Sequence, residues 1–342
     1  MTVNLVTGGS GFIGQHLVDQ LVASGESVRI LDLEPPATRR AGAAFIQGSI
    51  TDQRIVEEAM DGVDYVYHAA AIPHLWIPDP AMFQEVNVLG THRVFEAAVK
   101  AGVKRIVHTS SSTVLTGGVE GRRQVTLDER HRTSKDDLIG DYARSKWQSE
   151  QVAQSYADRM SVVIVLPTLP LGPGDRHLTP PTRMLLDFVN GKHRAFVDSI
   201  LNIVDVRDVA SGHRQACSHG QCGERYILNS HSLDMKSFLH ELELVTGHRM
   251  PIWRVPISAA VVFSSMLEFW SNHVTGRMPI APLAGTRMSM RKITFDGRYA
   301  TDRLGFQRTP LFETLRDAVG WLEREDWLTD EIDISTFAFG KD

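Results

Sequence analysis

The chain has 342 residues, of which 42% are hydrophobic and 23% are charged, and its formal net charge is −5. This composition is that of a globular protein large enough for one α/β domain and a smaller lobe. A negative charge without a basic run argues against nucleic acid as the main partner, because binding along a phosphate backbone needs clustered Lys and Arg. The two cysteines, Cys217 and Cys222, are too few for a disulfide scaffold and match no zinc pattern, so no metal is expected.

The first residues predict a dinucleotide site. An apolar strand at Val3 to Val6 runs through the turn Thr7 to Gly14 into a helical pattern from Phe12 to Ala23. Glycines at this spacing permit a tight turn, a close approach of backbone amides to a pyrophosphate, and close packing of helix on strand. The predicted cofactor contacts in this turn are Gly8, Gly11, Phe12, Ile13 and Gly14.

The second apolar run, Val28 to Leu31, is closed by Asp32. A carboxylate at the end of this strand would accept hydrogen bonds from the ribose hydroxyls of the adenosine. It would also repel the additional phosphate of NADP, although Arg39 and Arg40 could compensate in part. The sequence therefore predicts NAD and favours it over NADP.

Strand and helix signals alternate through the first half, which predicts a doubly wound parallel Rossmann sheet, an α/β fold. The proline-rich run after Leu166 marks the crossing into a smaller, C-terminal substrate lobe. The chain is expected to return to the sheet at Ile200 to Val206 and at Arg225 to Leu228, so that the lobes interleave. The predicted NAD-binding domain is 1–166 with about 200–229, and the predicted substrate lobe is 167–199 with 230–342.

Small hydroxyl residues follow the predicted strand Arg105 to His108, and Tyr142 with Lys146 comes about thirty residues later. Residues four apart on a helix share one face. An adjacent ammonium and a cationic nicotinamide would favour the phenolate of Tyr142, which could then shuttle a proton. A serine hydroxyl at the strand end would orient the substrate oxygen while hydride moves.

Taken together, these motifs resemble the extended short-chain dehydrogenases/reductases of the NAD-dependent epimerase/dehydratase family. The downstream half is most similar to the branch of 3β-hydroxysteroid dehydrogenases, dihydroflavonol reductases and hopanoid-associated sugar epimerase-like proteins. The resemblance implies Ser111 as the catalytic hydroxyl, with Ser112 the next candidate, and Asp208 as a helix cap. It also implies cofactor contacts beyond the glycine turn, at Ser49, Ile50, His68, Ala69, Ala70, Ala71, Asn87, Tyr142, Lys146, Pro167 and Leu169. Asp52 is a further candidate for adenine recognition.

Three functions are compatible with this set. The first is an NAD-dependent oxidoreductase that interconverts a secondary alcohol and a ketone on a small to medium, fairly apolar substrate, whose pocket Trp253, Phe263, Phe269 and Trp270 could wall. The second is a sugar or nucleotide-sugar epimerase or dehydratase that uses transient oxidation by bound NAD. Nucleotide-sugar epimerases of this family usually have an asparagine near the crossing that holds the sugar nucleotide, and here Leu166 is followed by Pro167 and Thr168. Dehydratases usually have an acidic pair just after the catalytic serine or threonine, and none is present here. Both differences reduce the support for the second function. The third is an NAD(H)-sensing regulator.

The resemblance suggests a homodimer through the helices Val86 to Lys100 and Tyr142 to Asp158. The chain opens on its first strand, so we expect a cytoplasmic enzyme. The apolar stretch Pro256 to Trp270 is too short to span a membrane, and three roles are considered for it: a helix packed on the substrate lobe, a pocket wall, or an interfacial contact.

Overall fold

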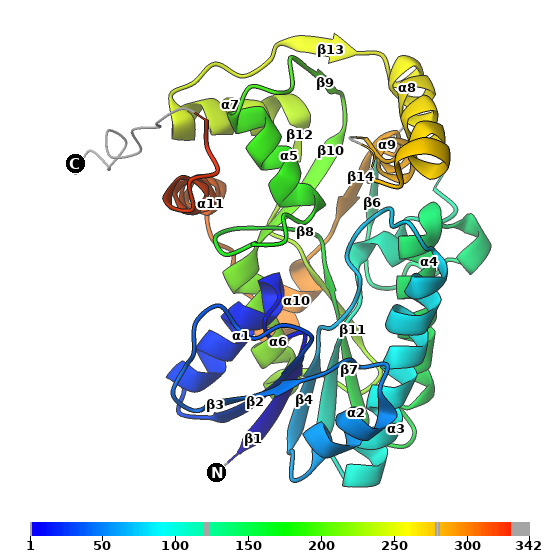
Figure 1. Ribbon diagram of the computed structural model, residues 1–342, viewed down its shortest axis with the longest axis vertical. Coiled ribbons are helices and arrows are strands. Elements are labelled where there is room, and N and C mark those ends of the chain that lie inside the picture. The colour runs from blue at the N-terminus through cyan, green and yellow to red at the C-terminus, as the bar shows by residue number, and fades with distance from the viewer. Residues whose placement is uncertain (1, 120–123, 278, 280, 330–342) are drawn as a thin grey trace.

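The computed structural model describes residues 2–119, 124–277, 279 and 281–329, in two parts stacked along the long axis of the molecule (Figure 1). The lower part in this view is built on a seven-stranded sheet, and the upper part holds the smaller sheets. The fold therefore has a large layered half and a smaller half, as the sequence predicts.

The large sheet has the strand order β11-β7-β5-β4-β1-β2-β3, and all neighbouring strands are parallel. Its strands are β1 (Val3–Thr7), β2 (Ser27–Asp32), β3 (Ala43–Gln47), β4 (Tyr65–His68), β5 (Arg105–Thr109), β7 (Ser161–Pro167) and β11 (Arg225–Leu228). The strand order reverses between β1 and β4, which confirms the doubly wound Rossmann fold. In such a sheet a ligand binds outside the carboxyl ends of the strands at this reversal.

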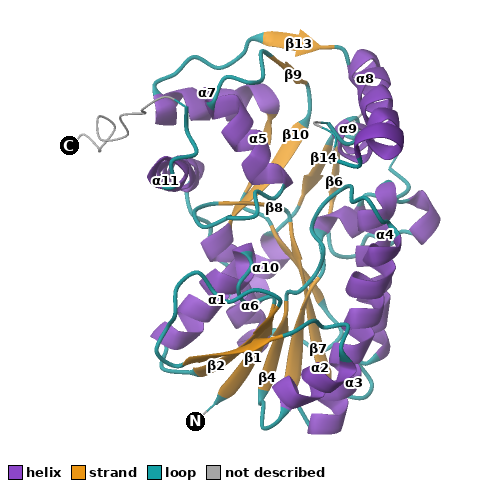
Figure 2. Ribbon diagram, viewed as in Figure 1, coloured by secondary structure: helices purple, strands orange, loops and turns teal. Residues whose placement is uncertain are grey.

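Helices cover both faces of the large sheet (Figure 2). They are α1 (Phe12–Ala23), α2 (Gln53–Met60), α3 (Thr91–Ala101), α4 (Gly140–Ser155), α6 (Val206–His219) and α10 (Arg298–Leu304). Helix α6 packs against α1 and α10, while α3 packs against α2 and α4. Alternate strand residues enter two separate cores, with Ile106 and Ile164 on one face and Val107 and Val163 on the other. The strands are apolar without interruption because both faces are covered.

The smaller half has a three-stranded sheet of order β12-β10-β8 and two two-stranded sheets. Their strands are β6 (Val125–Leu127) with β14 (Ile293–Phe295), β8 (Leu169–Leu171), β10 (Ile200–Asp205), β12 (His231–Asp234), and β9 (Ala195–Val197) with β13 (Trp253–Val255). Helices α5 (Pro180–Val189), α7 (Met235–Thr246) and α11 (Leu311–Arg324) enclose a third core that includes Phe238 and Leu315. The remaining helical elements are η1 (Phe83–Gly90), η2 (Ser112–Leu115), η3 (Lys135–Asp137), α8 (Ile257–Trp270), η4 (Ser271–Thr275) and α9 (Leu283–Ser289).

The expected return of Ile200 to Val206 to the large sheet is wrong. Strand β10 pairs with β8 in parallel and with β12 in antiparallel orientation, both in the smaller half. A buried apolar strand has the same sequence pattern in either sheet. The proline-rich segment forms strand β8, and β10 pairs with the edge of β8 instead of the large sheet. The return of Arg225 to Leu228 is confirmed, because β11 pairs with β7.

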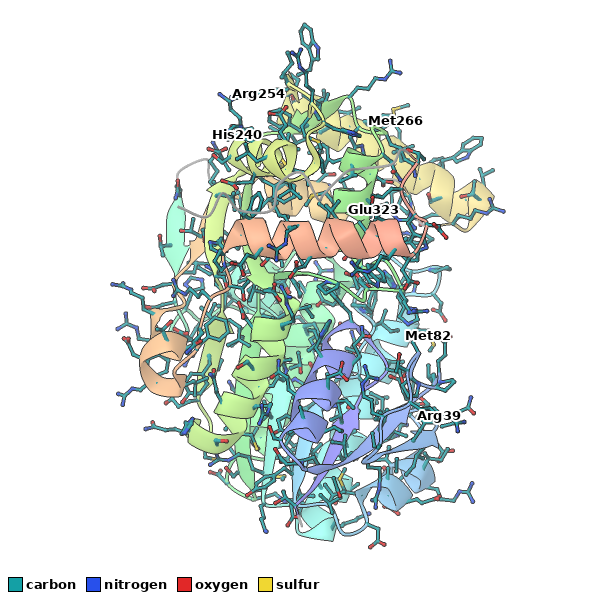
Figure 3. All side chains as sticks on the ribbon, turned by 90° about the vertical axis from the view of Figure 1, so that its left-hand side faces the viewer. Arg39, Met82, His240, Arg254, Met266 and Glu323 are labelled. Atoms are coloured by element: carbon teal, nitrogen blue, oxygen red, sulfur yellow. The ribbon has the colours of Figure 1, made fainter. Side chains whose placement is uncertain are left out.

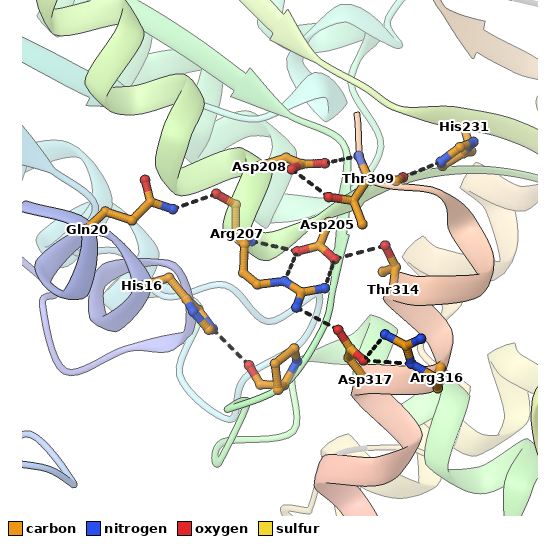
Figure 4. Close-up of polar contacts among 11 residues, drawn as sticks. His16, Gln20, Asp205, Arg207, Asp208, His231, Thr309, Thr314, Arg316 and Asp317 are labelled. Atoms are coloured by element: carbon orange, nitrogen blue, oxygen red, sulfur yellow. Dashed lines mark hydrogen bonds and ion pairs between the residues drawn. The ribbon is translucent and has the colours of Figure 1, made fainter. Parts of the chain in front are cut away.

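Polar contacts join the two halves where α6 begins (Figure 4). The Asp205 carboxylate caps this helix by accepting from the backbone N of Arg207 at 2.8 Å, and the Arg207 guanidinium bridges Asp205 and Asp317. Asp208, which we expected to be the cap, instead accepts from the backbone N and the hydroxyl of Thr309. The cap lies three residues earlier because the helix begins at Val206, directly after the strand.

Candidate active site

The glycine turn between β1 and α1 is packed too tightly for side chains. Gly8 has a φ of +71°, and a Cβ there would lie 2.7 Å from the backbone N of Ala70. A Cβ on Gly14 would overlap the carbonyl oxygen of Gly8. Helix α1 begins after Gly11 with no acidic residue in its first turn and no side-chain cap on its first amides. These residues fit a dinucleotide, because a pyrophosphate needs both close backbone approach and a helix N-terminus.

Gly14→Ala is expected to lower the affinity for NAD about tenfold or more, because the added methyl must displace the Gly8 backbone. Calorimetric titration of NAD into the purified protein measures this. Gly25→Ala is the control: Gly25, unlike Gly14, has a positive φ, but a Cβ there meets nothing within 4 Å. Unchanged affinity in Gly14→Ala would show that this turn does not hold the cofactor.

Asp32 ties the end of β2 to the glycine turn. Its carboxylate accepts from the backbone N of Ser10 at 2.9 Å and from that of Leu33 at 2.7 Å. Arg40, one of the two arginines considered as partners for the additional phosphate of NADP, forms a two-bond ion pair with Asp19 of α1. Of the two arginines, only Arg39 is exposed without an ion pair to Asp19 (Figure 3), which favours NAD further.

The predicted adenine side lies after β3. The Ser49 hydroxyl hydrogen-bonds the Thr51 hydroxyl at 2.7 Å. Ile50 is 5% exposed, and its side chain packs directly against the backbone of Gly90, where it leaves no room for a Cβ. The Asp52 carboxylate caps α2 by accepting from two backbone amides, so it has a structural role and is a weaker candidate for adenine recognition. Ser49 and Ile50 remain the predicted contacts.

The segment after β4 is fixed by hydrogen bonds of His68 and Asn87 and by packing against Gly8. The His68 imidazole is 1% exposed and bonds the hydroxyls of Thr7 and Thr91, so only its backbone is available to a groove. Ala69 and Ala70 lie against Gly8, and Ala71 follows half-buried. The Asn87 amide exchanges two hydrogen bonds with the backbone of Ile72 and donates to the Ser145 hydroxyl at 2.9 Å. Asn87 thus fixes this segment against α4, as the resemblance implies.

Ser111, Tyr142 and Lys146 meet at the carboxyl ends of β5 and β7. The Ser111 hydroxyl caps η2 by accepting from the backbone N of Thr113, and it acts to lower the pKa of Tyr142, so it lies near the phenol. Lys146, one turn after Tyr142 on α4, donates to the carbonyl of Thr109 at 2.6 Å. Pro167 ends β7 beside this strand end, and Leu169 begins β8. The predicted catalytic residues are therefore neighbours in space.

The protonation of this group differs from our expectation. Burial raises the pKa of Tyr142, and the hydrogen bond with Ser111 opposes that rise only in part. Burial also lowers the pKa of Lys146 to about 8, and the charge of Glu150 opposes this. We expected Lys146 itself to favour the phenolate, but its ammonium is bound to the Thr109 carbonyl and does not lower the pKa of Tyr142. In the protein alone Tyr142 is a neutral phenol, and therefore a proton donor.

Glu150 is a site-supporting residue that our sequence reasoning missed. Its carboxylate accepts from the Ser110 hydroxyl at 2.5 Å and from the Arg225 guanidinium at 3.0 Å, and both charged side chains are almost fully buried. Ser110 immediately precedes Ser111, so Glu150 fixes the strand end that carries the predicted catalytic hydroxyl. The available signal is the spacing of Tyr142, Lys146 and Glu150, which puts all three on one helix face.

Buried histidines lie beneath the site. His68 bonds two threonines, and His213 bonds the Thr109 hydroxyl and the Val209 carbonyl at 2.7 Å each. Burial lowers the pKa of His68 to about 3 and that of His213 to about 4. The pKa of His108, which lies between them, is also lowered by burial. All three are neutral at pH 7.

These histidines predict a loss of stability on acidification. Unfolded histidines take up a proton near pH 6.5, whereas His68 and His213 resist protonation until pH about 3 and 4. The unfolded state therefore binds more protons between these limits, and each residue costs about 2 kcal/mol of unfolding free energy at pH 5. His213→Gln should reduce the difference in unfolding free energy between pH 7 and pH 5 by about that amount, as measured by urea denaturation. His240→Gln, at an exposed histidine of α7, is the control; an equal effect of both variants would contradict the prediction.

The aromatic residues considered as a pocket wall do not form one. Trp253, Phe263, Phe269 and Trp270 are 73%, 58%, 64% and 58% exposed, and so they are neither pocket nor core. Helix α8 presents Phe263, Phe269 and Trp270 outward because its polar side packs on α9, and Trp253 lies on strand β13. Within the described residues, no helix combines the length and apolarity that crossing a membrane requires.

Comparison with known proteins agrees with this geometry. The model of the NAD dependent epimerase/dehydratase family matches residues 4–228. A protein of Synechocystis sp. that carries the name of a dihydroflavonol 4-reductase is 33% identical over 94% of this chain and 95% of its own. A ketoreductase of Stigmatella aurantiaca, named for a farnesylated dihydroquinoline oxide, is 32% identical over 88% of this chain and 90% of its own.

Solved structures are similar over nearly the whole chain. The crystal structure of gox2253 has a TM-score of 0.83 and 30% identity, covering 96% of this chain and 100% of that one. MoeE5 in complex with UDP-glucuronic acid and NAD has a TM-score of 0.73 and 26% identity, covering 95% of this chain and 100% of its own. The same fold therefore serves both reductases and proteins that bind nucleotide sugars.

Proposed function

The chain belongs to the NAD dependent epimerase/dehydratase family, and we propose that within it this NAD-dependent enzyme interconverts a secondary alcohol and a ketone on a small to medium, fairly apolar substrate. The observation that carries this proposal is the placement of Ser111, which influences the pKa of Tyr142, beside a helix that carries Tyr142 and Lys146 on one face, at the carboxyl edge of the sheet.

Each residue has a distinct part in the proposed reaction. Bound NAD supplies the hydride chemistry at C4 of its nicotinamide. The Ser111 hydroxyl donates a hydrogen bond to the substrate oxygen, which orients the carbonyl and stabilises its developing charge. In reduction the Tyr142 phenol gives its proton to that oxygen, and in oxidation the phenolate takes the proton back. In this proposal the Lys146 ammonium, which donates to the Thr109 carbonyl in the protein alone, would hold the nicotinamide ribose of bound NAD.

The Tyr142 phenol, whose pKa is raised by burial, is protonated near neutral pH and can donate the proton that reduction requires. Two features support a substrate less polar than a nucleotide sugar. The residues after Ser112 are Thr113, Val114 and Leu115, which include no acidic pair for dehydration. The residue directly after Leu166 is a proline, so the asparagine that would hold a sugar nucleotide at this crossing is missing. The Stigmatella relative, a ketoreductase named for a farnesylated substrate, also supports this reading.

The second candidate is epimerisation through transient oxidation, and the structural likeness to MoeE5 favours it. A net oxidoreductase consumes or produces NADH in proportion to product, whereas an epimerase returns the hydride. The test offers ketones with NADH, and secondary alcohols with NAD, and follows the near-ultraviolet absorbance of NADH. Turnover of a nucleotide sugar without net NADH change would replace the first proposal with the second. Cofactor binding with no turnover in either assay would favour the NAD(H)-sensing regulator.

The proposed assembly is a cytoplasmic homodimer through η1, α3 and α4. Trp147 and Val152 are only partly buried against the core of one chain, and Leu89 is 42% exposed, so a partner's helices would cover remaining apolar surface. Sedimentation equilibrium of the purified protein tests this assembly.

A further inference from the structure

Helix α8 and η4 carry a continuous apolar surface on their solvent side. Its residues are each 58–66% exposed, and we call them the α8 face: Val262, Phe263, Met266, Phe269, Trp270 and Val274. Spacings of three and four place them along one side of the helix. Of the 14 residues of α8, only Ser264 is buried. A contiguous apolar surface of this kind marks an interaction site.

The polar side of α8 faces inward, which is the reverse of an ordinary surface helix. The Ser264 hydroxyl bonds that of Thr286 at 2.7 Å, and the Glu268 carboxylate accepts from the backbone N of Leu283 at 2.8 Å. Both contacts fix α8 on α9. The helix is therefore held in an orientation that exposes its apolar side, and no element of the described chain covers it.

The surroundings of the α8 face are basic. Residues 244–292 include six Lys or Arg and one acidic residue, a net charge of +5 in a chain whose total is −5. Arg249, Arg254, Arg277 and Arg287 are exposed, whereas Glu268 is half-buried. Arg277 follows Val274 of the α8 face by three residues, and Arg254 and Met266 project from the same end of the molecule in Figure 3.

We propose that the α8 face binds the surface of an anionic phospholipid bilayer. An apolar helix side with aromatic residues can enter the boundary between headgroups and acyl chains, and arginines beside it can contact lipid phosphates. Trp253 and Trp270 suit the headgroup level, because an indole ring is apolar with one polar N–H. If a second copy of the chain bound to this face, the exposed arginines of the two copies would come close together, and their repulsion opposes self-association.

The α8 face adjoins the candidate active site through α9. A Cβ on Gly140, two residues before Tyr142, would lie 2.9 Å from the Cβ of Ala284, and one on Gly285 would lie 3.0 Å from the side chain of Leu75. Helix α9 thus lies between the α8 face and the start of α4. If the proposed function holds, an apolar substrate could reach the site from the bilayer; this consequence, unlike the binding itself, rests on that function.

The test is co-sedimentation of the full chain with vesicles of phosphatidylcholine containing phosphatidylglycerol, and with vesicles of phosphatidylcholine alone. We expect binding to the anionic vesicles that weakens with added salt, and weaker binding to the neutral ones. Arg254→Gln with Arg277→Gln should lower the partition coefficient about thirtyfold, since each basic residue near an anionic surface contributes about fivefold. Phe263→Asp with Phe269→Asp should abolish binding. Leu244→Asp, at a 46% exposed position of α7 outside the α8 face, is the matched control.

Several results would overturn the proposal. One is a wild-type chain that stays in the supernatant with both kinds of vesicle. Another is a pair of aspartate substitutions that converts a dimer into a monomer while vesicle binding is absent, which would assign the α8 face to a second copy. The arginine variants change only exposed side chains, so they keep the proposal testable if the aspartate variants fold poorly. NADH-dependent turnover without vesicles should be unchanged in the arginine variants, which separates membrane binding from the proposed function.

Discussion

Tyr142→Phe is expected to lower turnover on the order of 10³-fold while leaving the fold and the NAD affinity unchanged. The substitution removes one hydroxyl, which hydrogen-bonds Ser111 and whose pKa is raised by burial, so the residue is a proton donor at neutral pH. Phenylalanine keeps the ring and its contact with Phe83. Steady-state rates of ketone reduction, followed by NADH absorbance, measure the effect once a substrate has been found in the assay described above.

Two controls make this result specific. Tyr299→Phe removes a hydroxyl from a ring that stacks on Tyr226 far from the catalytic group, and it should leave turnover unchanged. Ser111→Ala should reduce turnover more than Ser112→Ala, because Ser111 is the serine whose hydroxyl influences the pKa of Tyr142. Retention of full activity by Tyr142→Phe would remove the acid–base role on which the proposed reaction depends.

The parts of the molecule that follow from local chemistry could be predicted from the sequence. The glycine turn is one, since its spacing reflects contacts between Gly8, Gly14 and the adjacent backbone within a few residues. The shared face of Tyr142 and Lys146 is another, because the helix repeat alone determines it. The alternation of strands and helices along the chain likewise predicts the doubly wound class, although it does not give the strand order.

What could not be predicted depends on contacts between distant segments. The partner of the strand Ile200–Asp205 is chosen by the nearest open edge, and its apolar pattern is the same in either sheet. Helix α8 has enough apolar residues for a core helix, and only its packing on α9 shows that they face outward. The pKa of Tyr142 is raised by burial, and the Lys146 ammonium donates to the Thr109 carbonyl; both depend on tertiary packing that the sequence does not reveal.

Glu150 is the clearest case, because its importance comes from two residues far away in sequence. The Glu150 carboxylate and the Arg225 guanidinium are 1% and 8% exposed and form an ion pair, and Ser110 uses the second carboxylate oxygen. Glu150→Ala leaves the guanidinium buried with no opposite charge. Arg225 would keep only its bonds to the carbonyls of Glu129 and His131. We expect this variant to lose about 3–5 kcal/mol of unfolding free energy.

Urea denaturation of Glu150→Ala, Arg225→Met and the double variant measures the coupling between these residues. The double variant should be more stable than Glu150→Ala alone, because removing the second charge relieves the uncompensated burial. Glu57→Ala is the matched control: it removes the same carboxyl group from an exposed ion pair with Lys100, and such a pair contributes little. If Glu150→Ala were no more damaging than Glu57→Ala, the buried pair would not hold the strand end that carries Ser111. Turnover would then report only the loss of the Glu150 charge, which raises the pKa of Lys146, and not a displacement of Ser111.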